Sequence, residues 1–186
     1  SLEMQWNQLI PQQEKGRKFE EKYAQLQYMF VGGDIEKLSE MKADRAKESA
    51  RLKWIAYKDQ FFSTVLIAGD GFESTQMEST PQNALSRHIK EYKTTASLPF
   101  DITGKKNVDL KYYFGPNHYN TLKAYDKDVE KSERLHLNEL VPLGWKIVAW
   151  INKALVIPMF DLFSSWGLHI GIVILLMTLV IKLIIL

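Results

Sequence analysis

The stretch AQLQYMFV, Ala24 to Val31, carries the pattern that decides the fold. Its bulky residues Leu26, Tyr28 and Phe30 fall on one side of an extended chain, with glutamines or a methionine between them. The stretch NVDLKYYFG, residues 107–115, alternates in the same way. Alternation with aromatic residues predicts β-strands, so the first 127 residues are predicted to be mainly β and to form a sandwich.

Other runs of similar composition predict further strands at 54–68, 72–80 and 87–96. The sequence Gly-Asp-Gly at 69–71 is expected to turn the chain as a hairpin between two of these strands. A short helix is predicted within GPNHYNTLKAYD, residues 115–126, with Pro116 in its first turn. Residues 34–50 fit either a helix or an irregular strand with a charged loop.

Composition excludes several classes of function. The chain has 186 residues and no cysteine, which excludes disulfides, thiolate catalysis and cysteine-based metal sites. Its 24 lysines and arginines against 22 acidic residues give a net charge of +2, which argues weakly against a nucleic-acid partner. Both ends favour a segment of a longer protein, because Ser1 precedes no cap or turn and Leu186 lies within an apolar run.

Charge is dense up to about Arg134 and almost vanishes after it. Residues 142–165 have helical spacing and predict an amphipathic helix lying along a bilayer surface, with a kink or an interruption at Pro158. The alternative is a core helix of a soluble domain. Residues 128–141 are expected to be a linker. The tryptophans that suit a membrane–water boundary, and would act as interfacial anchors, are Trp145, Trp150 and Trp166.

The run GLHIGIVILLMTLVIKLIIL, residues 167–186, predicts a transmembrane helix, since about 20 helical residues span about 30 Å. Lys182 is its one deep charge, and a lysine at the bilayer centre costs roughly 2.5–3.5 kcal/mol. The surrounding apolar residues offset that cost at roughly 0.3–0.6 kcal/mol each. Lys182 either reaches the interface from near the helix end, which its position alone slightly favours, or faces a water-filled cavity.

No metal or catalytic site is expected. The four histidines, at 88, 118, 136 and 169, share no metal-ligand spacing, and a calcium loop opening at Asp126 lacks its glycine and its closing glutamate. No nucleophilic triad or paired-carboxylate arrangement can be recognised from spacing, so the chain is not expected to be an enzyme. Trp54, Phe61 and Phe62 are candidates for a ligand cleft, although such aromatic strand residues more often pack in a core.

The chain resembles the YidC membrane protein insertases in the form found in Bacteroidetes-type bacteria. The resemblance covers almost the whole chain, and it rests on the stretches in combination. These are RLKWIAYKDQFFSTVLIA (51–68), KYYFGPNHYNTLKAYD (111–126), LVPLGWKIVAWINKALVIPMFDLFSS (140–165) and WGLHIGIVILLMTLVIKLIIL (166–186), with EKGRKFEEKYAQLQYMF (14–30) fitting as well.

The resemblance implies that residues 1–127 are the carboxy-terminal part of a periplasmic β-supersandwich domain. It implies that 142–165 is an interfacial helix on the periplasmic face and that 167–186 is the first transmembrane helix of the insertase core. The stretch TLVIK, residues 178–182, is similar to the family's threonine-x-x-x-arginine/lysine pattern. Lys182 would then be the positive residue of the substrate groove, and Thr178 its neighbour one turn earlier.

The function implied is insertion and folding of nascent inner-membrane proteins, alone or with the Sec translocon, without a cofactor. The partners implied are nascent membrane proteins, the translocon and the lipid bilayer. No nucleic acid would bind this segment directly, and the ribosome would be contacted by cytoplasmic parts. The location implied is the bacterial inner membrane, multi-pass in the full protein, with residues 1–165 on the periplasmic side. The main alternative is a membrane-tethered periplasmic β-sandwich that binds a carbohydrate or a protein partner.

Overall fold

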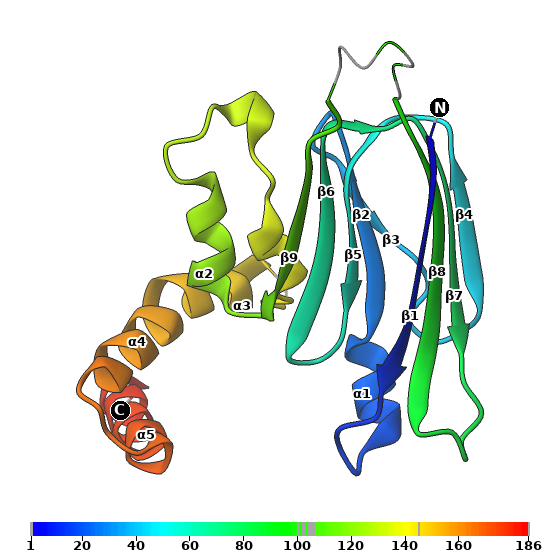
Figure 1. Ribbon diagram of the computed structural model, residues 1–186. Coiled ribbons are helices and arrows are strands. Elements are labelled where there is room, and N and C mark those ends of the chain that lie inside the picture. The colour runs from blue at the N-terminus through cyan, green and yellow to red at the C-terminus, as the bar shows by residue number, and fades with distance from the viewer. Residues whose placement is uncertain (1, 100, 102, 104–106, 145, 186) are drawn as a thin grey trace. The chain divides into compact units, whose positions relative to one another are not determined.

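A computed structural model describes residues 2–99, 101, 103, 107–144 and 146–185 (Figure 1). The chain divides into two compact units, Ser1–Val141 and Pro142–Leu186. The first unit is mainly β, as the sequence predicts, and the second is helical.

Within the described residues, the strands of the first unit form two antiparallel sheets. The four-stranded sheet has the order β1-β8-β7-β4, and the five-stranded sheet has the order β3-β2-β5-β6-β9. The strands are β1 (Leu2–Pro11), β2 (Gln25–Phe30), β3 (Ile35–Lys37), β4 (Asp44–Glu48), β5 (Leu52–Lys58), β6 (Phe62–Phe72), β7 (Ser74–Pro81), β8 (His88–Leu98) and β9 (Leu110–Pro116).

The two sheets pack face to face over an apolar core. Leu26 and Tyr28 of β2 contribute from one sheet, and Met77 and Tyr92 contribute from the other. Tyr57 of β5 joins the layers directly, because its hydroxyl donates to the Trp6 carbonyl at 2.8 Å and accepts from the Thr94 hydroxyl at 2.7 Å. The side chains that alternate along β2 therefore alternate between this core and the opposite face of the five-stranded sheet.

That opposite face is covered as well. The helix α2 (Tyr119–Lys123) and the 3₁₀ turns η1 (Ala124–Asp126), η2 (Lys131–Glu133) and η3 (Leu137–Leu140) follow β9. Leu137 and Leu140 are buried against Trp54, so residues 135–141 pack on the sheet, whereas residues 128–134 are mostly exposed. The indole of Trp54 donates to the Leu135 carbonyl at 2.7 Å and fixes this segment in place. The unit thus has three layers, two sheets and a helical segment.

The hairpin predicted at residues 69–71 is wrong. β6 runs on through these residues, and β6 and β7 belong to different sheets. Trp54 of β5 pairs with Ile67 of β6, whereas Leu52, two residues earlier in β5, pairs with Phe72, five residues later in β6. The extra residues of β6, which include both glycines, therefore form a bulge. Gly71 has a φ of +83°, and a β-carbon added there would lie 3.2 Å from the Leu52 carbonyl oxygen, so a larger residue would be strained.

The turn that does form lies inside the predicted strand 54–68. The Asp59 carboxylate accepts hydrogen bonds from the backbone N–H groups of Phe61 and Phe62, at 2.7 and 2.6 Å, and reverses the chain between β5 and β6. Residues 34–50 form β3 and β4 rather than a helix. The helix predicted within 115–126 is confirmed, but it starts at Tyr119 because Pro116 ends β9.

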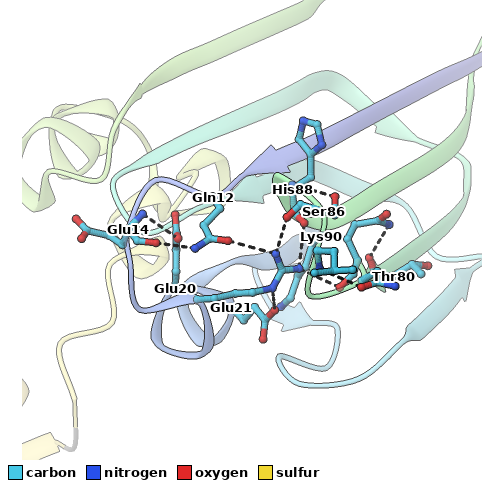
Figure 2. Close-up of polar contacts among 12 residues, drawn as sticks. Gln12, Glu14, Glu20, Glu21, Thr80, Ser86, His88 and Lys90 are labelled. Carbon is cyan, nitrogen blue, oxygen red and sulfur yellow. Dashed lines mark hydrogen bonds and ion pairs between the residues drawn. The ribbon is translucent and has the colours of Figure 1, made fainter.

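The helix α1 (Arg17–Tyr23), at the lower end of the sandwich in Figure 1, is held by buried polar contacts. The Glu20 carboxylate is fully buried and accepts hydrogen bonds from the N–H groups of Gln13 and Glu14, at 2.8 and 3.2 Å. Arg17 donates to the carbonyls of the loop between β7 and β8, at 2.9 Å to Ser86 and 3.0 Å to His88. Figure 2 shows these loop residues beside Gln12 and Glu21, which Arg17 also contacts.

Two buried lysines, one from each sheet, meet the carboxyl end of α1. Lys58 of β5 donates to the Tyr23 carbonyl at 2.9 Å, and Lys90 of β8 donates to the Ala24 carbonyl and, at 2.7 Å, to the Glu40 carbonyl. Burial disfavours the charged ammonium and lowers the pKa of each lysine to about 8, although nearby acidic groups partly oppose the shift.

Raising the pH from 7 to about 9.5 is expected to increase the free energy of unfolding of the first unit. The pKa of Lys58 and Lys90 is about 8 in the folded chain and about 10.4 in an unfolded chain. The unfolded chain therefore binds more protons between these values, and stability rises by about 2 kcal/mol for each of the two lysines. Above pH 10 stability falls again, because burial raises the pKa of Tyr57 and Tyr92.

Urea denaturation followed by near-ultraviolet circular dichroism measures this profile. Lys90→Met should flatten part of the rise. Lys93→Met, at an exposed position of the same strand, should leave the rise unchanged. A steady loss of stability from pH 7 to 10 in the unaltered chain would contradict the role of the buried lysines.

Candidate functional site

The second unit is helical because its apolar residues recur at helical spacing. It contains α3 (Lys146–Ile151), the π-helical turn η4 (Asn152–Val156), α4 (Ile157–Ser165) and α5 (Ile170–Ile185). The first three follow one another without a break. Pro158 has no N–H to donate to the preceding turn, and the wider π turn lies directly before it. The interruption predicted at Pro158 is thus a π turn within a continuous helix.

A tight turn joins α4 and α5. Gly167 has a φ of +69°, which favours glycine, and its N–H donates to the Ser164 carbonyl at 3.1 Å. The ring nitrogen Nδ1 of His169 accepts a hydrogen bond from the Gly171 N–H at 3.2 Å and so caps the start of α5. Met159 of α4 and Val173 of α5 are the only buried side chains among those described in this unit.

Most of the other large apolar side chains of this unit are exposed. The exposed set is Val148, Trp150, Ile151, Leu162, Trp166, Ile170, Ile172, Ile174, Leu175, Leu179, Val180, Leu183 and Ile184. A soluble surface rarely leaves so many apolar side chains in water, and such surfaces mark membrane or protein contacts. This apolar surface of the second unit is the candidate functional site.

The residues predicted for the site lie on this unit. Thr178 and Lys182 are one turn apart on the exposed surface of α5 and share a face. The Thr178 hydroxyl donates to the Ile174 carbonyl at 2.8 Å. Trp150 and Trp166 are 68% and 59% exposed, whereas Trp145 lies outside the described residues.

The described part of α5 has 16 residues, about 24 Å of helix. Among the residues that the structure describes, no helix combines the length and the apolar character needed to cross a bilayer. The same part of the chain contains no cluster of three or more histidine or acidic side chains placed to hold a metal ion.

The first unit carries cavities of its own. A cavity of about 380 Å³ lies beside β1 and is lined by Tyr57, Phe62 and Phe114. Of the aromatic residues considered for a ligand cleft, Phe62 lines this cavity and Phe61 is half-exposed. Trp54 is buried in a second core, which lies between the five-stranded sheet and the segment from α2 to Val141.

Sequence reasoning missed two groups of residues. The buried cations around α1 have no sequence signature, because strand lysines usually face solvent. The second group lines a pocket of about 490 Å³ after β9 and includes Lys123, Lys127 and Arg134. Their spacing of four and seven residues would suit one long helix, but α2 ends at Lys123 and only the folded-back chain brings Arg134 beside the two lysines.

The fold and the site together define a β-sandwich joined to a helical unit whose apolar side chains are exposed. Residues 2–158 match the family model described as the YidC periplasmic domain. The chain is 50% identical over 186 residues to a protein of Parabacteroides distasonis named membrane protein insertase YidC, covering 99% of this chain and 29% of the relative.

Two further relatives carry the same name. The Bacteroides fragilis protein is 46% identical over 184 residues, and a Porphyromonas gingivalis protein is 36% identical over 188 residues. The alignments cover 99% and 98% of this chain and 29% of each relative. The chain therefore belongs to the YidC family, and it spans about three tenths of the length of the curated relatives it matches.

Gly167→Ala is expected to weaken the α4–α5 turn by about 1 kcal/mol, because alanine disfavours the left-handed backbone that Gly167 adopts. Hydrogen exchange of the Gly171 to Val173 amides, in detergent micelles, measures the loosening of the turn.

Gly171→Ala is the matched control. Gly171 is helical, and an added methyl group would meet the His169 ring only at ordinary contact distance, 3.4 Å. Alanine at this helical position should stabilise the helix by up to about 1 kcal/mol, so amide exchange should slow or stay the same. Equal effects of the two substitutions would contradict the turn geometry.

Proposed function

We propose that the chain is part of a bacterial membrane protein insertase that inserts and helps fold nascent inner-membrane proteins, alone or with the Sec translocon. The observation that carries the proposal is the apolar surface of the second unit, which directly follows a sandwich with its own buried cores. The family membership and the names of the relatives support the same activity. This activity requires neither covalent chemistry nor a cofactor.

In this proposal the sandwich is the carboxy-terminal part of a periplasmic supersandwich domain in an inner-membrane protein. Residues 142–165 lie along the periplasmic face of the bilayer, with Trp145, Trp150 and Trp166 as interfacial anchors. The apolar run 167–186 begins the membrane-spanning core of a multi-pass protein. Lipid would then cover the side chains of α5 that are exposed in the isolated chain.

Lys182 is proposed to face a hydrophilic groove formed with further helices of the longer protein. An ammonium group there would hold water within the bilayer and attract acidic residues of an incoming segment. Thr178 shares its helix face and would line the same groove. The competing role for Lys182 is to reach the headgroups without contacting substrate.

The alternative function is a membrane-tethered module that binds a carbohydrate or a protein partner through the sandwich. The cavity beside β1 is the observation that favours it, since aromatic residues there lie with polar groups such as Gln8 and Asp59. The apolar surface of the second unit has no role in such a module beyond attachment, so the insertase proposal accounts for more of the chain.

Replacing Lys182 by alanine in the intact protein is expected to slow insertion of a substrate with an acidic amino-terminal tail by roughly tenfold. A lost attraction of about 1.4 kcal/mol suffices for that factor. Insertion into membrane vesicles, followed by protease protection of the tail, measures the rate.

Lys182→Arg keeps the charge and should retain most of the activity. Lys153→Ala removes a cation from the same unit outside the proposed groove and should have little effect. Normal insertion by the Lys182→Ala protein would exclude the groove role and favour the headgroup role.

A further inference from the structure

A pocket of about 490 Å³ lies on the first unit, between α2 and the turns that follow it. Three cations line it, Lys123, Lys127 and Arg134, together with His136. Asp126 is the acidic residue of the lining. The pocket wall therefore carries a net positive charge, although the surrounding segment as a whole is not basic.

Asp126 holds the wall together. Its two carboxylate oxygens accept hydrogen bonds from the backbone N–H groups of Leu135 and His136, at 2.6 and 2.9 Å. These bonds bring residues 134–136 back beside α2, and the side chain of Asp126 is only 11% exposed. The His136 ring reaches the same carboxylate at 4.0 Å. Asp126 thus places the cations without forming a close ion pair with any of the three.

The three cations are not neutralised by acidic side chains of the described residues, although the Lys123 ammonium lies 5.9 Å from the centre of the Tyr119 ring. In the described part of the chain no carboxylate forms an ion pair with Lys123, Lys127 or Arg134. Arg134 uses its Nε to donate to the Val129 carbonyl at 3.3 Å, which orients the guanidinium and leaves its terminal nitrogens for another acceptor. Lys127 and Arg134 are both exposed.

The backbone near the pocket is also unusual. His136 and Asp128 adopt left-handed conformations, with φ of +50° and +60°, which residues other than glycine rarely adopt. The bonds to Asp126 hold His136 in that conformation. Strained residues of this kind often lie at binding sites.

A forked guanidinium and two ammonium groups are suited to a phosphate group. The pocket is also near the second unit in the sequence, because only three residues lie between Asn138, which lines the pocket, and Pro142, which begins the second unit. We propose that the pocket binds the phosphodiester of an anionic phospholipid headgroup at the surface on which the second unit rests. This inference depends on the proposed membrane attachment of residues 142–186.

The test measures binding of the 186-residue chain to vesicles of phosphatidylcholine, with and without phosphatidylglycerol, at constant ionic strength. The quantity compared is the ratio of the affinity for vesicles with phosphatidylglycerol to the affinity for vesicles without it. The double variant Lys127→Gln, Arg134→Gln should lower this ratio by about fivefold for each cation removed. Lys131→Gln is the matched control, since Lys131 belongs to the same segment but does not line the pocket. Its effect should be less than twofold.

Titration with inorganic phosphate, followed by the amide shifts of Arg134 and His136, separates the lipid from free phosphate. The chain should respond to vesicles at far lower phosphate concentrations than to the free ion. Equal responses to both sources would overturn the lipid assignment, and equal losses in the pocket and control variants would overturn the pocket itself.

Failure of the chain to bind neutral vesicles would refute the membrane attachment instead. In that case the phosphate titration tests the pocket by itself. Amide shifts confined to Arg134 and His136 would support a phosphate-binding pocket, and unchanged spectra would refute the pocket.

Discussion

Burial of the five-stranded sheet on both faces is the constraint on which the rest of the structure depends. β5 shows it most clearly, because Tyr57 points into the core between the sheets while Trp54 points into the second core. Either face left uncovered would expose large aromatic side chains to water. The four-stranded sheet covers one face, and the segment from α2 to Leu140 covers the other. The sandwich unit therefore extends as far as Val141, where the character of the chain changes.

At α1 the end of the sandwich is closed by buried hydrogen bonds to backbone carbonyls. Lys58 and Lys90 reach α1 from the two sheets, and Arg17 ties α1 to the loop after β7. Removing one partner of such a buried polar contact leaves the other partner without its hydrogen bond, so these contacts favour one arrangement of the strands. The second unit contrasts with this, since Met159 and Val173 are its only buried side chains among the described residues. A domain with buried polar contacts is thus joined to helices whose large apolar side chains are mostly exposed.

The sequence predicts the parts of this arrangement that depend on local periodicity. Alternation in residues 24–31 and 107–115 identifies β2 and β9, and apolar helical spacing identifies the second unit. Prediction from local periodicity fails where strand pairing determines the structure, as at residues 69–71. The chain already reverses at Asp59, so the glycines at 69 and 71 form a bulge of β6 instead of a hairpin turn. For the candidate site, spacing places Thr178 and Lys182 on one helix face, but spacing does not determine what surrounds that face. The pocket around Arg134 follows from the Asp126 contacts, which no sequence period indicates.

In the proposed arrangement, lipid covers the second unit while the sandwich stays in water. Single-tryptophan variants of the chain, bound to vesicles with brominated acyl chains, test it most directly. Bromine quenches indole fluorescence only at short range, so Trp150 and Trp166 should be strongly quenched, whereas Trp54, buried in the sandwich, should keep its emission. Equal emission from Trp54, Trp150 and Trp166 in the presence and absence of bromine would contradict the account.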